Sequence, residues 1–196
     1  VVFGPGFFHE GYAEIPMERI DTVEDVIVRE ESPTGVVTFK RVDCCPAYYL
    51  PDTFSVARTT SNISVTWGFE PSSNERRIFL LEYIARGVPR VYNDPTPAAS
   101  NQQLWWLAVG PEVTKVAPVR HAFVTLRLPA PVPLDRVVIG QNDALGDPRA
   151  HTRDGQVWFW QADDLDRGAR LEIRLQFPPL VPAIKPQWQE RDDQRR

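Results

Sequence analysis

The sequence predicts an all-β fold: an antiparallel β-sandwich, immunoglobulin-like or related, with Pro-rich loops and little helix. In residues 63–69, and again in residues 171–177, apolar residues alternate with small or polar ones. Period two places successive side chains on opposite faces of a strand, so each segment has one apolar and one polar face, as in stacked antiparallel sheets. The chain also holds 19 prolines against 11 glycines, which favours many short strands because proline is excluded from helix interiors and central strands.

Short strands separated by turn sequences account for most of the chain. A Gly-Pro-Gly turn at 4–6 precedes an aromatic stretch, and Ser-Pro-Thr-Gly at 32–35 and Asp-Gly at 154–155 mark later turns. Within the expected strand 76–86, residues 78–85 are apolar on both faces except at Glu82, which indicates a central, covered strand. We expect strands at about 23–30, 36–42, 62–70, 76–86, 103–109, 119–128, 135–140, 156–162 and 170–177.

A length of 196 residues suits one large all-β domain or two small ones. We expect a single β-sandwich domain over residues 1–184. Residues 185–196 are expected to form a polar linker, because the chain there is proline-containing and ends in charged and amide side chains with little to bury. The chain opens on Val1, without Met and inside a strand-like stretch, so we infer that a further segment precedes it.

Composition and charge exclude some classes of partner. The net charge is −4 with acids and bases interleaved, and no basic stripe stands out, so nucleic acid is not an expected partner. No apolar run approaches the roughly 20 residues that span a bilayer. Cys44 and Cys45 are adjacent, which predicts two free thiols, because a disulfide between neighbouring residues needs a strained ring.

The sequence carries no recognisable catalytic or cofactor pattern, so we expect no enzyme and no cofactor. It contains no Gly-x-Ser-x-Gly, no P-loop and no dinucleotide-binding glycine pattern. Glu82 is the one carboxylate that stands in an otherwise apolar strand, and it is the residue on which an enzymatic hypothesis would rest. The three histidines, His9, His121 and His151, lie far apart without the spacing of metal ligands.

Two acidic loops have the oxygen-rich composition that calcium prefers. One contains Asn142, Asp143, Asp147 and Asp154, and the other covers 163–166. Neither has the spacing of an EF-hand, and Asp and Asn are common turn formers. We therefore interpret both as solvated hairpin loops and expect no metal site.

The six tryptophans supply the only candidate binding residues. Trp105 and Trp106 are adjacent and must point to opposite faces of a strand, while Trp158 and Trp160 share one face and Phe159 takes the other. An exposed pair of aromatic rings on a sandwich can stack on a sugar ring or contact another protein. Trp105, Trp106, Trp158 and Trp160 are thus the candidate ligand-binding residues, and burial in a two-sided core is the alternative.

Four segments, taken in order, resemble a known family. They are Tyr-x-x-Ile-Pro at 12–16, Arg-x-Phe-x-Leu-x-Tyr at 77–83, Gln-Leu-Trp-Trp at 103–106 and Val-Thr-Leu-Arg-Leu-Pro at 124–129. This pattern is similar to that of the predicted bacterial membrane proteins catalogued as domain of unknown function 2207, over about residues 3–188. The shared motifs are structural rather than catalytic. The usual first strand of the family, before Val1, is absent from this chain.

The resemblance implies an extracytoplasmic domain on the outer face of the bacterial cell membrane, tethered by transmembrane helices that follow its C-terminus. It implies no activity, cofactor or ligand. We therefore expect a non-enzymatic domain for protein interaction or envelope sensing. Its expected partners are the transmembrane remainder of its own chain and an envelope protein or glycan. The alternative is a carbohydrate-binding module that uses the tryptophans.

Overall fold

The fold is mostly β, as expected from the alternating segments. A computed structural model describes residues 1–43, 50–92, 101–140, 151–180 and 184–195. Strands account for 55% of the structure and helices for 11%, and nearly all strand pairs are antiparallel, which confirms an all-β, sandwich-like fold. Among the described strands, the exception is the short parallel pair of β4 (Lys40–Arg41) with β5 (Thr53–Arg58).

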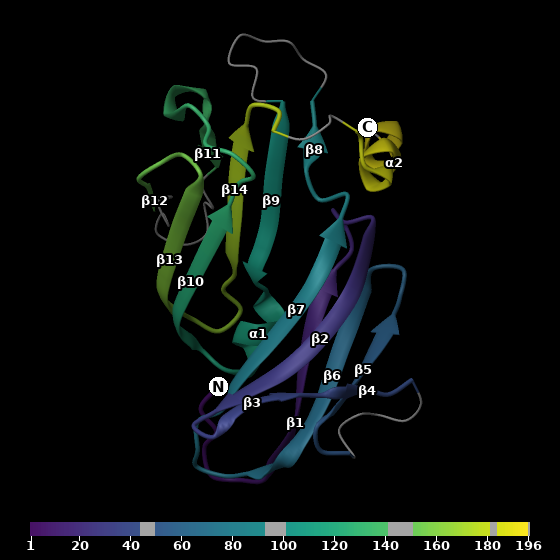
Figure 1. Cartoon of the computed structure of the whole chain (residues 1–196), viewed down its shortest axis with the longest axis vertical. Coiled ribbons are helices and arrows are strands. Elements are labelled where there is room, and N and C mark those ends of the chain that lie inside the picture. Colours follow the sequence, from purple (N-terminus) through teal and green to yellow (C-terminus); the bar gives the residue numbers. More distant parts are fainter. Residues whose placement is uncertain (44–49, 93–100, 141–150, 181–183, 196) are drawn as a thin grey trace. The chain divides into compact units, whose positions relative to one another are not determined.

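The chain divides into two compact units, Val1–Gly87 and Val88–Arg196, where we expected one domain over 1–184. Each unit contains two sheets of its own (Figure 1). The reason for the difference is that a period of two shows which face of a strand is apolar, whereas the choice of pairing partner depends on the whole fold. Either half has enough strands to bury its own apolar faces.

The first unit consists of a four-stranded and a three-stranded sheet. In the first, the order is β1 (Phe8–Pro16), β6 (Asn62–Ser72), β5 and β4. In the second, the order is β3 (Gly35–Thr38), β2 (Thr22–Ser32) and β7 (Ile78–Arg86).

Aromatic side chains join the two sheets of the first unit. The Phe79 ring of β7 lies 5.6 Å from the ring of Trp67 and 5.0 Å from that of Phe69, both on β6, as measured between centroids. Trp67 and Phe69 are buried, and the prediction that Trp67 belongs to the core is confirmed. The segment 76–86, however, is not a central strand: β7 stands at the edge of its sheet, and Ile78, Leu80 and Ile84 are exposed on its outer face.

Gly11 of β1 is opposite Trp67 in the strand register, and a Cβ atom at Gly11 would lie 2.4 Å from the Trp67 ring. Because that ring is buried, it has little room to move. We expect Gly11→Ala to destabilise the first unit by about 1–3 kcal/mol, the usual cost of overpacking. Urea denaturation would measure this change. Gly4→Ala is the control, since a Cβ atom there meets no atom within 4 Å; equal effects of the two substitutions would contradict the prediction.

The second unit also pairs two sheets. One has the order β10 (Val119–Arg127), β13 (Val157–Leu165) and β12 (His151–Thr152). The other has the order β11 (Val138–Gly140), β14 (Leu171–Phe177), β9 (Gln102–Val109) and β8 (Arg90–Val91). Among its described residues, three short helical segments complete it: α1 (Pro111–Val116), the 3-10 helix η2 (Leu134–Arg136) and α2 (Gln187–Arg195).

The core of the second unit lies between these sheets. Trp158 and Trp160 from β13 pack with apolar residues of β14, and all of them are buried. Leu126 of β10 and Leu104 of β9 pack against the same cluster from their own strands. The inner faces of both sheets therefore meet in one apolar layer, as in a sandwich.

The C-terminal segment is a helix, α2, and not the polar linker that we expected over 185–196. Trp188 and Gln189 are buried. The Gln189 side chain accepts a hydrogen bond from the Val91 N–H (2.8 Å) and donates one to the Val91 carbonyl (2.6 Å), so it satisfies the edge of β8 as a strand partner would. Arg90 pairs with acidic side chains of α2, which explains how so polar a segment is held in place.

Candidate functional site: the exposed face of β10 and β13

The rings of Trp158 and Trp160 are not exposed for a ligand to stack on. Each is only 2% exposed, and the Trp158 indole N–H donates to the Gly155 carbonyl at 3.1 Å within the buried interior. Trp106 is partly buried and packs against the same core cluster. The face that these two β13 tryptophans share is therefore the core face, which corrects their assignment as candidate stacking residues.

Trp105 points to the other side of β9, as the adjacency of the two tryptophans predicted. Its indole N–H donates to the Glu172 carboxylate of β14, and the Arg174 guanidinium lies 5.6 Å from the centroid of its ring. The buried Gln103 side chain, in the orientation that satisfies its neighbours, accepts hydrogen bonds from Arg174 at 2.8 and 2.9 Å. Polar side chains of this unit thus already occupy the ring edge and a position over the ring.

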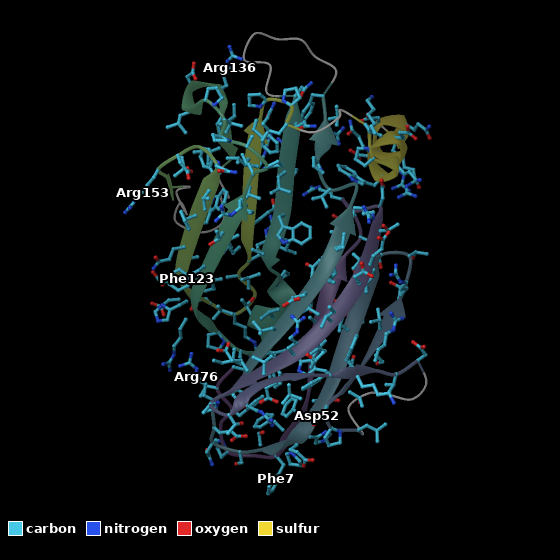
Figure 2. The ribbon with its side chains drawn as sticks, in the orientation of Figure 1. Phe7, Asp52, Arg76, Phe123, Arg136 and Arg153 are labelled. Carbon is cyan, nitrogen blue, oxygen red and sulfur yellow. The ribbon has the colours of Figure 1, made fainter. Side chains whose placement is uncertain are left out.

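The exposed aromatic residues of this unit are phenylalanines. Phe123 of β10 is 71% exposed and Phe159 of β13 is 46% exposed. Phe123 is opposite Gln161 in the strand register and Phe159 is opposite Thr125, so the two rings are diagonal neighbours on the outer face. Figure 2 labels Phe123, and Figure 1 shows β10 and β13 side by side.

A hollow of about 300 Å³ lies beside the two phenylalanines. It is lined by Phe123, Val124, Thr125, Phe159, Trp160 and Gln161. We name as the Phe face the outward-pointing residues of the two strands: His121, Phe123, Thr125, Phe159, Gln161 and Asp163. Aromatic rings flanked by hydroxyl, amide and charged groups are the usual composition of a binding surface.

A polar cluster closes one end of the Phe face. His121 Nδ1 lies 2.8 Å from a carboxylate oxygen of Asp163, and the Gln161 side chain donates to the other oxygen at 2.8 Å. The hydrogen bond with His121, followed by that with Gln161, lowers the pKa of Asp163 below its ordinary value. Asp163 therefore stays ionised and fixes the orientation of both neighbours.

The remaining candidates from the sequence do not assemble into a reaction centre. Glu82 is not a buried acid: its side chain is 52% exposed and forms an ion pair with Arg29 of β2. Within the described ranges, no group of three or more His, Cys, Asp or Glu side chains is placed to hold a metal ion. Cys44, Cys45, Asn142, Asp143 and Asp147 lie outside the described residues.

Asp154 belongs to the turn between β12 and β13. One of its carboxylate oxygens accepts hydrogen bonds from the backbone N–H groups of Val157 and Gln156, both at 2.9 Å. These bonds, with that of Val157 contributing most, lower the pKa of Asp154 from its ordinary 3.8. The carboxylate is thus a turn-forming group, as expected for a hairpin loop.

The lowered pKa of Asp154 predicts a pH dependence of stability. A carboxyl group whose pKa is lower in the folded state stabilises the fold above its unfolded pKa, and this stabilisation is lost as pH falls through the folded pKa. We expect the free energy of unfolding of the wild type to decrease below about pH 4. Asp154→Asn keeps an oxygen acceptor without the titration, so it should show a weaker decrease in denaturation experiments at pH 7 and pH 3. Parallel pH profiles would contradict the prediction.

The Phe face was not found from the sequence, although part of its signal was visible. Phe159 takes the face opposite to Trp158 and Trp160, so it had to be outside once the tryptophans were inside. On β10, Phe123 likewise points to the outer face. The residues that alternate with it, Ala122, Val124 and Leu126, point toward the core. The alternation identified both faces correctly and left open which of them was covered.

Comparisons with family models, with curated proteins and with solved structures returned no match for this chain. The resemblance to the membrane-protein family therefore stays a prediction. Among the residues that the structure describes, no helix is long and apolar enough to span a membrane.

Proposed function

We propose that this chain is a non-enzymatic binding domain that contacts another protein through the Phe face. We further propose, from the resemblance alone, that it works on the extracytoplasmic side of a bacterial membrane as part of a membrane-anchored protein, in protein interaction or envelope sensing. The observation that supports a binding role best is the exposure of Phe123 and Phe159 on one sheet face.

Two neighbouring aromatic rings in water carry a hydrophobic cost that burial against a partner would remove. Aromatic residues are enriched at the centres of protein interfaces, and polar groups form their rims. The Phe face has this arrangement, with two phenylalanines over a hollow and the cluster of His121, Gln161 and Asp163 at one end. The carbohydrate alternative is weaker, because the stacking pair on which it rested, Trp158 and Trp160, is buried.

The test is a titration of soluble envelope proteins against the purified domain. We expect an envelope protein that binds the wild type to bind the double variant Phe123→Ser, Phe159→Ser at least about tenfold more weakly, a loss of about 1.4 kcal/mol. Val116→Ser on α1 is the matched control, since Val116 is also exposed, at 74%, and lies outside the Phe face. Circular dichroism would verify that all variants are folded.

Two results would contradict the proposed function. One is equal binding of the wild type and the double variant to every partner found. The other is the absence of binding across a broad panel together with measurable turnover of a substrate, which would indicate an enzyme.

A further inference from the structure

β10 is an edge strand with an unused row of backbone groups. It terminates the order β10, β13, β12, and eight of its nine residues, all but Arg120, pair with β13 without any shift in register. The backbone N–H of the residue after β10, Leu128, donates to the Gln156 carbonyl at 2.8 Å. The N–H of Leu128 therefore points toward β13. Since N–H groups alternate in direction along a strand, those of His121, Phe123 and Thr125 point to the free edge.

This edge has no backbone partner in the described part of the chain. Natural edge strands are usually protected by a bulge, a proline, charged side chains or a covering element. β10 has neither a bulge nor a proline between Val119 and Arg127, and its two arginines stand only near its ends. An edge of this length and regularity is suited to accept another strand, and the peptide-binding mode known as β-augmentation uses such edges.

The charges of β10 indicate what such a strand would carry. Arg120 and Arg127 stand near its two ends, both exposed, and the strand contains no acidic residue. Neither guanidinium forms an ion pair with any residue that the structure describes. The two acids of the paired strand, Asp163 and Asp164, stand near its end, and Asp163 is already engaged by His121 and Gln161. The unsatisfied charge along the free edge is therefore positive.

Phe123 is the central residue of β10, and it combines a backbone N–H at the free edge with an exposed aromatic ring. Its N–H points to the free edge, and its ring is the most exposed one on the Phe face. A strand added beside β10 would place one of its side chains directly opposite Phe123 on the same face, where an apolar side chain would cover the exposed ring.

We propose that β10 accepts an extended segment of another protein as an additional antiparallel strand, with an apolar residue opposite Phe123 and acidic residues opposite Arg120 and Arg127. This inference rests on the proposed function and specifies the partner's chemistry. A second copy of the chain fits less well, because its own β10 would bring the same two arginines and His121 to the interface.

The probe for the test is a synthetic nine-residue peptide, matched to the nine residues of β10, with a fluorescent label. It has valine at its centre, glutamates at its first and eighth positions, opposite Arg127 and Arg120 in antiparallel register, and threonine elsewhere. We expect fluorescence anisotropy to show binding at least about tenfold tighter than that of the same peptide with two lysines in place of the glutamates. The difference should shrink in about 1 M salt, where surface charges are screened.

Backbone methylation tests the strand geometry itself. In the proposed register the N–H of the fifth peptide residue faces β10, whereas that of the fourth faces away. N-methylation of the fifth residue should reduce affinity at least about tenfold, and N-methylation of the fourth should change it little. In the protein, Thr125→Pro removes one free-edge donor at a position where proline is tolerated, and Thr125→Val is its control.

Each outcome decides the inference. Failure of the acidic peptide to bind, equal binding of the lysine peptide, or indifference to methylation of the fifth residue would overturn it. Sedimentation that shows a dimer of the wild type but not of Thr125→Pro would also overturn it, by identifying a second copy as the occupant. An envelope protein could lose its binding when Phe123 and Phe159 are substituted and still bind Thr125→Pro normally. That result would show that strand addition is wrong, while the proposed function would stand.

Discussion

Replacement of Arg77 by methionine is expected to destabilise the first unit by about 3–5 kcal/mol, the usual result of removing one partner from a buried ion pair. Arg77 stands immediately before β7, and its guanidinium bonds both oxygens of the Glu30 carboxylate on β2, at 2.5 and 2.9 Å. The two side chains are only 16% and 11% exposed. Without Arg77, the Glu30 carboxylate would remain in this poorly hydrated position with no cation beside it.

The remaining contacts of Arg77 make it hard to replace. Its Nη1 donates to the Glu70 carbonyl at 2.7 Å and to the Ser72 hydroxyl at 2.6 Å, both on β6. Its guanidinium also lies 4.7 Å from the centroid of the Phe69 ring. This one side chain therefore ties the two sheets of the unit together. Arg77→Lys should rescue little of the stability, because a lysine cannot form the two-pronged contact with Glu30.

Urea unfolding followed by circular dichroism would measure the loss. The control is Arg86→Met, which removes the exposed pair of Arg86 on β7 with Glu24 on β2 and should have little effect. The double variant Glu30→Gln, Arg77→Met removes both charges and should recover part of the stability lost in Arg77→Met. A loss no larger than that of Arg86→Met would show that the ion pair is dispensable.

The regular strands were predictable from the sequence because period two is a local property. Expected strands at 62–70, 103–109, 119–128 and 170–177 coincide with β6, β9, β10 and β14 within about two residues, the usual uncertainty of element ends. By contrast, β5 was missed although Phe54 is buried between more polar neighbours, because six residues give a weak signal. The helix α2 was missed because the contacts that hold it in place come from Arg90 and Val91, about a hundred residues earlier in the chain.

The candidate site was less predictable than the fold, for a physical reason. Sequence alternation separates two faces of β13, with Trp158 and Trp160 on one and Phe159 on the other, but burial depends on which sheet packs against them. Residues of β14 such as Ile173 and Leu175 cover the tryptophans. The sequence predicts that these residues form a strand, but not that this strand packs against the tryptophans. The division at Gly87 was similarly hidden, because it follows from the pairing of distant strands.

Truncation of a core side chain and of its exposed neighbour would test this assignment of faces directly. We expect Trp160→Ala to destabilise the second unit by about 3–5 kcal/mol, the range found for the loss of large aromatic side chains from cores. Trp160 is 2% exposed and packs in the cluster that joins the two sheets of the unit, so its removal would leave a large cavity. A loss of this size is a large fraction of the roughly 5–15 kcal/mol by which a domain is ordinarily stable.

Phe159→Ala is the matched control for Trp160→Ala, because the two residues are adjacent on β13 and point to opposite faces. Phe159 is 46% exposed, and its truncation is expected to change the free energy of unfolding by no more than about 0.5 kcal/mol, as for other surface substitutions. Its effect should instead appear in partner binding, since it belongs to the Phe face. Thermal unfolding and partner titration of both variants would therefore separate the two roles: Trp160→Ala loses stability, and Phe159→Ala loses affinity. If Phe159→Ala proved the more destabilising of the two, the tryptophans would be the exposed residues, and the stacking surface first expected at Trp158 and Trp160 would return as the candidate site.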